Sequence, residues 1–390
     1  MGRLLLVYSN TKRDLLKDSH NIFNRQRGIG GIMCPDFSNM QIDNIILHRV
    51  YDNNADGSIT PPKISDNFTT LEPEGLATLQ NRIVKAMGED SHSIQMQVID
   101  NTEGSTYQIC KSIIYSGDNN EKIRLSSQLA HKLARAQNGR NTPGGVLIII
   151  SGIIGSNNER KQFVGIIKAE LHDGFNIDEN QSIIILHLLT SLLLTPHQKF
   201  YKIGVFINDN SDASSDEVNE NDFSVLVYDH LMNRRESNQL ARYFFDNFLG
   251  CDYSTNDKTL TRDFYFRTKD FIERQIIPEE EKIEINTSLN SYMRNQQQAT
   301  VLVADFGNDN FSPEMRDSYS NFMRDSSFPD HAISKDISYL ENILKFRRLK
   351  FSSDVKIIAP SRNFDQIVHI DGFDDNETRI RIQGNITDDD

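Results

Sequence analysis

The chain has 390 residues, of which 37% are apolar and 25% are charged, and its formal net charge is -13. With 22 Phe and 12 Tyr it is too aromatic for a disordered chain, and its length allows at least two domains of ordinary size. The three cysteines lie too far apart for a disulfide framework or a C-x-x-C pair, and no apolar run reaches the roughly 18 residues of a membrane span, so we expect an intracellular protein in a reducing cytosol.

The two ends of the chain differ in charge and in pattern. Residues 1–39 hold six Lys or Arg against three Asp or Glu and show no sustained periodicity. A strand pattern starts at Met40, so we predict that residues 1–39 are an N-terminal extension and leave open whether they join the fold. Residues 385–390 are predicted to be an acidic tail.

Residues 40–233 have the pattern of an α+β domain with a mostly antiparallel sheet. An amphipathic helix is predicted over 71–89, after a loop rich in Asn, Asp, Gly and Pro. SIQMQVID and TYQICKSIIY alternate and predict strands, whereas SSQLAHKLARAQ predicts a short helix capped by Ser126 or Ser127.

Four β-rich runs follow in the same domain, and the first two are expected to pair antiparallel across a short polar turn. The link 172–199 contains an apolar stretch that predicts a crossing helix or strand. The four runs are GVLIIISGII, QFVGIIKAEL, YKIGVFIND and DFSVLVYDH.

The apolar period changes at residue 234, and residues 234–384 are predicted to be a mainly helical domain that ends in short strands. Helical spacing recurs over 234–251 and 260–276, and Pro278 with the glutamates after it suits the start of a third helix. The aromatic RYFFDNFLGC is expected to be core, although such density is also found in platforms for stacked bases. The closing strands are predicted in DVKIIAP, QIVHIDG and RIRIQGN.

The sequence contains no specific catalytic or metal-binding signature. The histidines form no H-x-x-x-H or H-E-x-x-H, and the PGG at 143–145 is not followed by GK[ST]. We therefore predict no catalytic residue, no metal, no cofactor and no enzymatic activity. Lys168 and Glu170, two residues apart in a predicted strand, leave a metal-dependent nuclease as the weakest alternative.

The stretch LKFRRLKF (344–351) concentrates cations between phenylalanines in an acidic chain. One interpretation is the cationic end of a helix that begins near Ser334, where the helix dipole favours positive charge. The other is a patch that contacts DNA phosphates, which gives salt-sensitive binding without sequence preference. The residues proposed for DNA contact are Lys345, Arg347, Arg348, Lys350, Lys356 and Arg362, and further candidates are Arg234, Arg235, Arg262, Arg267 and Lys269.

Several stretches, in this order, resemble the bacterial nucleoid-associated proteins of the roughly 37-kilodalton type. The likeness spans about residues 40–384, and the acidic segment 208–222 and residues 1–39 depart from the pattern. The stretches are IDNIILHRV (42–50), LAHKLARAQNGRNTPGGVLIII (129–150), FVGIIKAEL (163–171), ARYFFDNFLGC (241–251), SYMRNQ (291–296) and FSPEMRDSYSNFM (311–323).

This resemblance implies a non-enzymatic protein of the bacterial cytoplasm and nucleoid that binds double-stranded DNA. It also implies partners such as topoisomerases or other chromosome proteins and no membrane, and it leaves a homodimer open. It transfers no DNA-contacting position to this sequence. The alternative is a protein-interaction scaffold without direct DNA binding, for example in phage defence, that uses the aromatic helical half.

Overall fold

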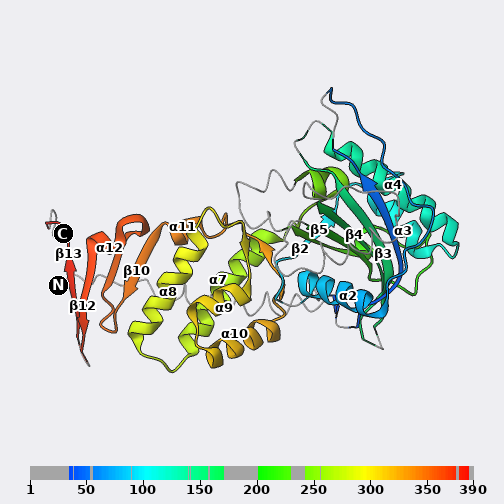
Figure 1. Cartoon of the computed structure of the whole chain (residues 1–390). Coiled ribbons are helices and arrows are strands. Elements are labelled where there is room, and N and C mark those ends of the chain that lie inside the picture. Colours follow the sequence, from blue (N-terminus) through cyan, green and yellow to red (C-terminus); the bar gives the residue numbers. More distant parts are fainter. Residues whose placement is uncertain are drawn as a thin grey trace.

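A computed structural model describes residues 35–37, 39–52, 56–88, 90–138, 140, 142–156, 159–170, 201–229, 242–254, 256–374 and 377–385. These residues form an elongated α+β molecule (Figure 1). A β-sheet with covering helices lies at one end, a helical region lies in the middle, and two β-hairpins lie at the other end. The predicted fold class is therefore confirmed. Most of the predicted extension, the apolar stretch within 172–199 and the end of the acidic tail lie outside the described residues.

The sheet has seven strands among the described residues, in the order β1-β3-β4-β5-β6-β2-β7. Every neighbouring pair in it is antiparallel, including the predicted pair of β3 and β4. The strands are β1 (Gln41–Val50), β2 (Ile94–Val98), β3 (Gly145–Ile154), β4 (Lys161–Glu170), β5 (Tyr201–Asn208), β6 (Phe223–Asp229) and β7 (Cys251–Tyr253).

Helices cover both faces of this sheet, which explains why β3 is apolar at almost every position. Leu147 and Ile149 point to the core under α3 (Thr106–Tyr115) and α4 (Asn119–Gln137). Ile148 and Ile150 point to the opposite core under α2 (Pro73–Met87), because successive strand residues alternate between faces. The π-helical turn η4 (Tyr243–Phe248) adds its aromatic side chains to the first core, as predicted for RYFFDNFLGC.

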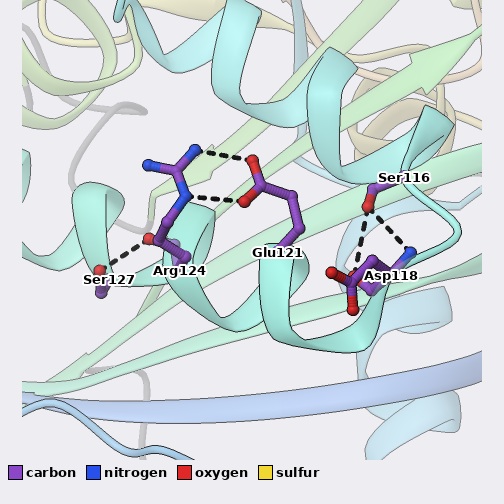
Figure 2. A network of polar contacts seen from close by, with 5 residues as sticks. All are labelled: Ser116, Asp118, Glu121, Arg124 and Ser127. Atoms are coloured by element: carbon purple, nitrogen blue, oxygen red, sulfur yellow. Dashed lines mark hydrogen bonds and ion pairs between the residues drawn. The ribbon is translucent and has the colours of Figure 1, made fainter.

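Two predictions in this region are wrong. TYQICKSIIY forms the helix α3 and not a strand, since Ser105 caps it by accepting a hydrogen bond from the Gln108 amide. The helix predicted with Ser126 or Ser127 as its N-cap begins earlier, at Asn119, and its N-cap is Asp118, whose carboxylate accepts from the Asn120 amide at 2.9 Å. Figure 2 shows this N-terminus, where Glu121 pairs with Arg124 and the Ser127 hydroxyl donates to the Arg124 carbonyl.

The helical middle of the molecule has a separate aromatic core. Phe264, Phe306 and Tyr319 are fully buried in it, with ring centroids about 6 Å apart in two of the pairs. Its elements are α7 (Asp257–Arg274), α8 (Glu279–Arg294), β8 (Thr300–Val301), α9 (Val303–Asn310), α10 (Pro313–Asp325), β9 (Ile333–Ser334) and α11 (Glu341–Leu344). The helices predicted over 260–276 and after Pro278 are confirmed as α7 and α8.

Two hairpins close the chain at the end of the molecule that lies away from the large sheet (Figure 1). They share a small core of Ala359, Phe364 and Val368, to which Leu349 and Ile380 contribute. The elements are β10 (Phe346–Lys350), β11 (Lys356–Pro360), η5 (Ser361–Asn363), α12 (Phe364–Ile367), β12 (Val368–Phe373) and β13 (Thr378–Ile382).

The helix predicted to begin near Ser334, with the cations of LKFRRLKF at or just beyond its end, is wrong. The helix α11 covers only Glu341–Leu344, and the cationic residues after it form the strand β10. Phe351 and Asp354 close the turn, because the Asp354 amide donates to the Phe351 carbonyl at 3.0 Å. Asp354 has a φ of 64°, a left-handed conformation that Asp tolerates better than most residues.

A buried histidine in the large sheet makes stability depend on pH. His48 is 2% exposed; its Nδ1 accepts from the Ser65 amide, so its Nε2 carries the proton and donates to the Ser126 hydroxyl. Burial, with a smaller effect of His131, lowers the pKa of His48 from 6.5 to about 4. A histidine that already donates to the serine cannot take its proton, so this pair is structural.

We expect the wild-type free energy of unfolding to fall by about 2 kcal/mol more than that of His48→Gln between about pH 7.5 and about pH 5. The folded-state pKa lies below the unfolded value, so His48 gains a proton on unfolding, and its stabilisation is lost as the pH falls below about 6.5. Urea unfolding at the two pH values measures the difference. If wild type and His48→Gln lose the same free energy of unfolding between the two pH values, the lowered pKa of His48 is contradicted.

Candidate nucleic-acid interface

The register of β10 and β11 divides the cations of LKFRRLKF between two faces of the hairpin. Arg347 lies opposite Ala359, on the face that covers the small core. Arg348 lies opposite Ile358, and both side chains are exposed on the other face. We call this exposed side, with Phe346, Arg348, Lys356, Ile358 and Pro360, the outer face.

Arg347 is held by its own hairpin region. Its Nη1 donates to the Asp365 carboxylate at 2.6 Å, and its guanidinium carbon lies 4.4 Å from the Phe364 ring centroid. Its side chain is 14% exposed, whereas that of Asp365 is 79% exposed. Stacking and ion pairing occupy the guanidinium, so Arg347 supports the hairpin and does not stand on the outer face.

The other proposed residues lie on or beside the outer face. Lys345 is exposed at the end of α11, and its Nζ lies 5.5 Å from the Phe346 ring centroid. Lys350 stands opposite Lys356 at the end of the ladder next to the turn, and Arg362 is exposed in η5 just after β11. The hairpin therefore collects cations from 345–350 and 356–362 that the sequence separates by a turn.

Neither strand of this hairpin contains an acidic residue. β10 reads FRRLK and β11 reads KIIAP. Residues 344–385 hold eight Lys or Arg against six Asp or Glu, in a chain whose formal net charge is -13. The carboxylate of Asp371 is paired with Arg381 in the second hairpin, at 2.9 Å. Positive charge is thus concentrated on the outer face, where a polyanion would meet it at short range.

The further candidates on α7 do not belong to this patch. Arg262 pairs with Asp263 at 2.9 Å, and Arg267 donates to the Ser326 carbonyl and lies 6.0 Å from the Phe328 ring centroid. The Lys269 ammonium lies 5.8 Å from the Tyr265 ring centroid. Arg234 and Arg235 lie outside the described residues.

A pocket of about 540 Å³ between α8 and α9 has the wrong charge for a phosphate. Its lining includes Asp305 and Asp309 and no Lys or Arg. Desolvation by burial raises the pKa of Asp305; His92 opposes this shift and Asp309 adds to it. Two neighbouring carboxylates would repel an anionic ligand, so the pocket does not contribute to a nucleic-acid interface.

The nuclease alternative is not supported by the surroundings of Lys168. This side chain is 1% exposed, and its Nζ donates to the Pro143 carbonyl at 2.8 Å and contacts the Tyr243 hydroxyl at 3.0 Å. Within the part of the chain that the structure describes, no group of three or more His, Cys, Asp or Glu is arranged to hold a metal ion. The same residues include no helix that is long and apolar enough to cross a membrane.

The strand β10 and the exposure of apolar residues on the outer face were not predicted from the sequence, whereas β11 lies in the predicted strand DVKIIAP. Phe346 and Ile358 are both exposed, although apolar residues of their size are ordinarily buried. One local signal points to the hairpin, namely the turn residues SSD before a predicted strand. The helical spacing in ISYLENIL favoured a helix and masked it.

Comparison with known proteins identifies one family. No curated protein matches the chain. Residues 46–382 match the family described as nucleoid-associated protein YejK, a range that includes all of the large sheet except the first half of β1, the helical middle and both hairpins. Because this match covers most of the chain, the protein belongs to that family of nucleoid-associated proteins.

Proposed function

We propose that this protein binds duplex DNA in the bacterial nucleoid without catalysis, through the outer face of the β10–β11 hairpin. The observation that carries the proposal is the convergence of exposed cations on a hairpin whose two strands contain no acidic residue. The residues assigned to phosphate contact are Lys345, Arg348, Lys350, Lys356 and Arg362, with Arg347 as a supporting residue.

The acidic balance of the chain is compatible with this binding because salt screens distant charges. At physiological ionic strength the screening length is about 8 Å, so a phosphate on the hairpin interacts mainly with the cations beside it. The hairpin lies at the end of the molecule away from β5 and the acidic 208–222 segment that follows it (Figure 1). A duplex at this end therefore lies away from the acidic 208–222 segment.

The test is binding of the purified full chain to a duplex of mixed sequence, measured by fluorescence anisotropy. With four or five phosphate contacts we expect the affinity to fall roughly 150- to 500-fold between about 50 mM and about 200 mM salt, since each contact releases a bound counterion. If the full chain does not bind the duplex even at about 20 mM salt, the proposed DNA binding is contradicted.

A protein scaffold remains the second candidate, but the structure gives it less support than the sequence does. The aromatic residues of the helical half, which were expected to hold a partner, are mostly buried in their own core. Phe266 is the large aromatic of α7 that stays exposed. If topoisomerases or other chromosome proteins are partners, capture of such a partner that survives nuclease treatment would favour the scaffold over DNA binding.

A further inference from the structure

The outer face of the β10–β11 hairpin carries apolar side chains that a purely phosphate-binding surface does not need. Phe346 is 36% exposed and Ile358 is 55% exposed, and Val355 at the turn is 54% exposed. Solvent-facing positions of an antiparallel hairpin are ordinarily polar. Exposed apolar area on a strand is favourable only when a partner covers it.

The strand register places these apolar residues between the cations. Ile358 lies directly opposite Arg348 and two residues from Lys356 on the same strand. Phe346 lies opposite Pro360, next to Lys345. Directly opposed residues have Cβ atoms about 4.5–5.5 Å apart, so each apolar side chain lies within one residue spacing of a cation. Phosphates held by the cations would bring the apolar tips against the bases between them.

We propose that this hairpin is a wedge that bends duplex DNA, with Ile358 and Phe346 entering between base steps from the minor groove. This inference rests on the proposed function and adds a mode of binding to it. Apolar side chains of this kind unstack base steps and kink DNA by about 20–90° when cations beside them hold the backbone. The occupant is duplex DNA because the apolar residues lie among Arg348, Lys356 and Lys345 and no carboxylate is present in either strand.

The proposal is testable because the cations and the apolar side chains are expected to affect different properties of the complex. Cations determine the affinity, since phosphate contacts dominate it. Apolar wedges determine the deformation, since contact with an unstacked step requires the bend. Substitution of the apolar residues should therefore separate binding from bending.

The experiment measures bending of a doubly labelled duplex of about 30 base pairs by resonance energy transfer, at a salt concentration where the full chain saturates it. We expect wild type to raise the transfer efficiency, and the Phe346→Ser/Ile358→Ser variant to bind within about threefold of wild type while leaving the duplex straight. Ile276→Ser, which changes an exposed isoleucine outside the hairpin, is the matched control and should bend DNA like wild type.

Other outcomes would overturn the wedge alone or the wedge together with DNA binding. Binding by wild type without any bend, or equal bending by the double variant, would overturn the wedge and leave the proposed DNA binding intact. A wild-type chain that binds no duplex, but whose hairpin holds a protein partner after nuclease treatment, would overturn both. Unchanged thermal unfolding of the variants shows that the loss of bending does not come from loss of the fold.

Discussion

Asp229→Ala is expected to lower the free energy of unfolding by about 3–5 kcal/mol, because it breaks a buried ion pair by removing one partner. The Asp229 carboxylate accepts from the Lys202 ammonium, and the two side chains are 1% and 3% exposed. Removal of the acid leaves a buried ammonium without its carboxylate. The register also places Lys168 opposite Lys202 on the neighbouring strand, so a second cation adds to the cost.

Chemical denaturation of the variant measures this loss, and two further variants make it interpretable. Asp270→Ala removes the acid of an exposed pair with Arg274 on α7 and should cost only about 0.5 kcal/mol. The double variant Lys202→Met/Asp229→Leu removes both charges of the pair, leaves Lys168 in place, and should recover part of the stability. If Asp229→Ala lowers the free energy of unfolding no more than Asp270→Ala does, the buried ion pair between β5 and β6 does not stabilise the fold.

Replacement of three exposed cations on or beside the outer face is expected to weaken duplex binding by about 10- to 100-fold at about 50 mM salt. The variant is Lys345→Ala/Arg348→Ala/Lys356→Ala, and the three side chains are exposed, so the fold should be kept. Arg347 is left in place because its contacts with Asp365 and Phe364 hold the hairpin. Anisotropy titration gives the affinity.

A matched variant separates local contact from overall charge. Arg274→Ala/Arg316→Ala/Arg324→Ala removes the same charge from α7 and α10, where all three arginines are exposed or half-buried outside the hairpin. It changes the net charge of the chain by the same amount as the hairpin variant. We expect it to bind DNA like wild type, because screened charges at a distance contribute little.

Strands with a continuous apolar pattern were predictable from the sequence. GVLIIISGII forms β3, and its burial on both faces explains why neither alternation nor helical spacing is present in it. The strand predicted for TYQICKSIIY was wrong because Tyr, Ile and Thr favour strands locally, whereas the cap at Ser105 and the packing of α3 on the sheet favour a helix. Tertiary packing therefore determines the secondary structure of that segment.

The candidate site was predictable in its residues but not in its geometry. The cation cluster in LKFRRLKF is visible as sequence, and of the six residues proposed for DNA contact, Lys345, Arg348, Lys356 and Arg362 are exposed on or beside one hairpin face. Which side of the strand each cation occupies depends on pairing with β11, which lies beyond a turn. That pairing turns Arg347 inward to Asp365 and exposes Ile358 beside Arg348.

The dependence of duplex affinity on salt, compared between the outer-face variant and the matched α7 and α10 variant, tests the central claim most directly. We expect the logarithmic slope for the outer-face variant to be smaller than that of wild type by about 3, since each substituted cation no longer neutralises a phosphate, and the slope for the matched variant to be unchanged. Equal slopes for the two variants would show that the hairpin does not contact the DNA backbone.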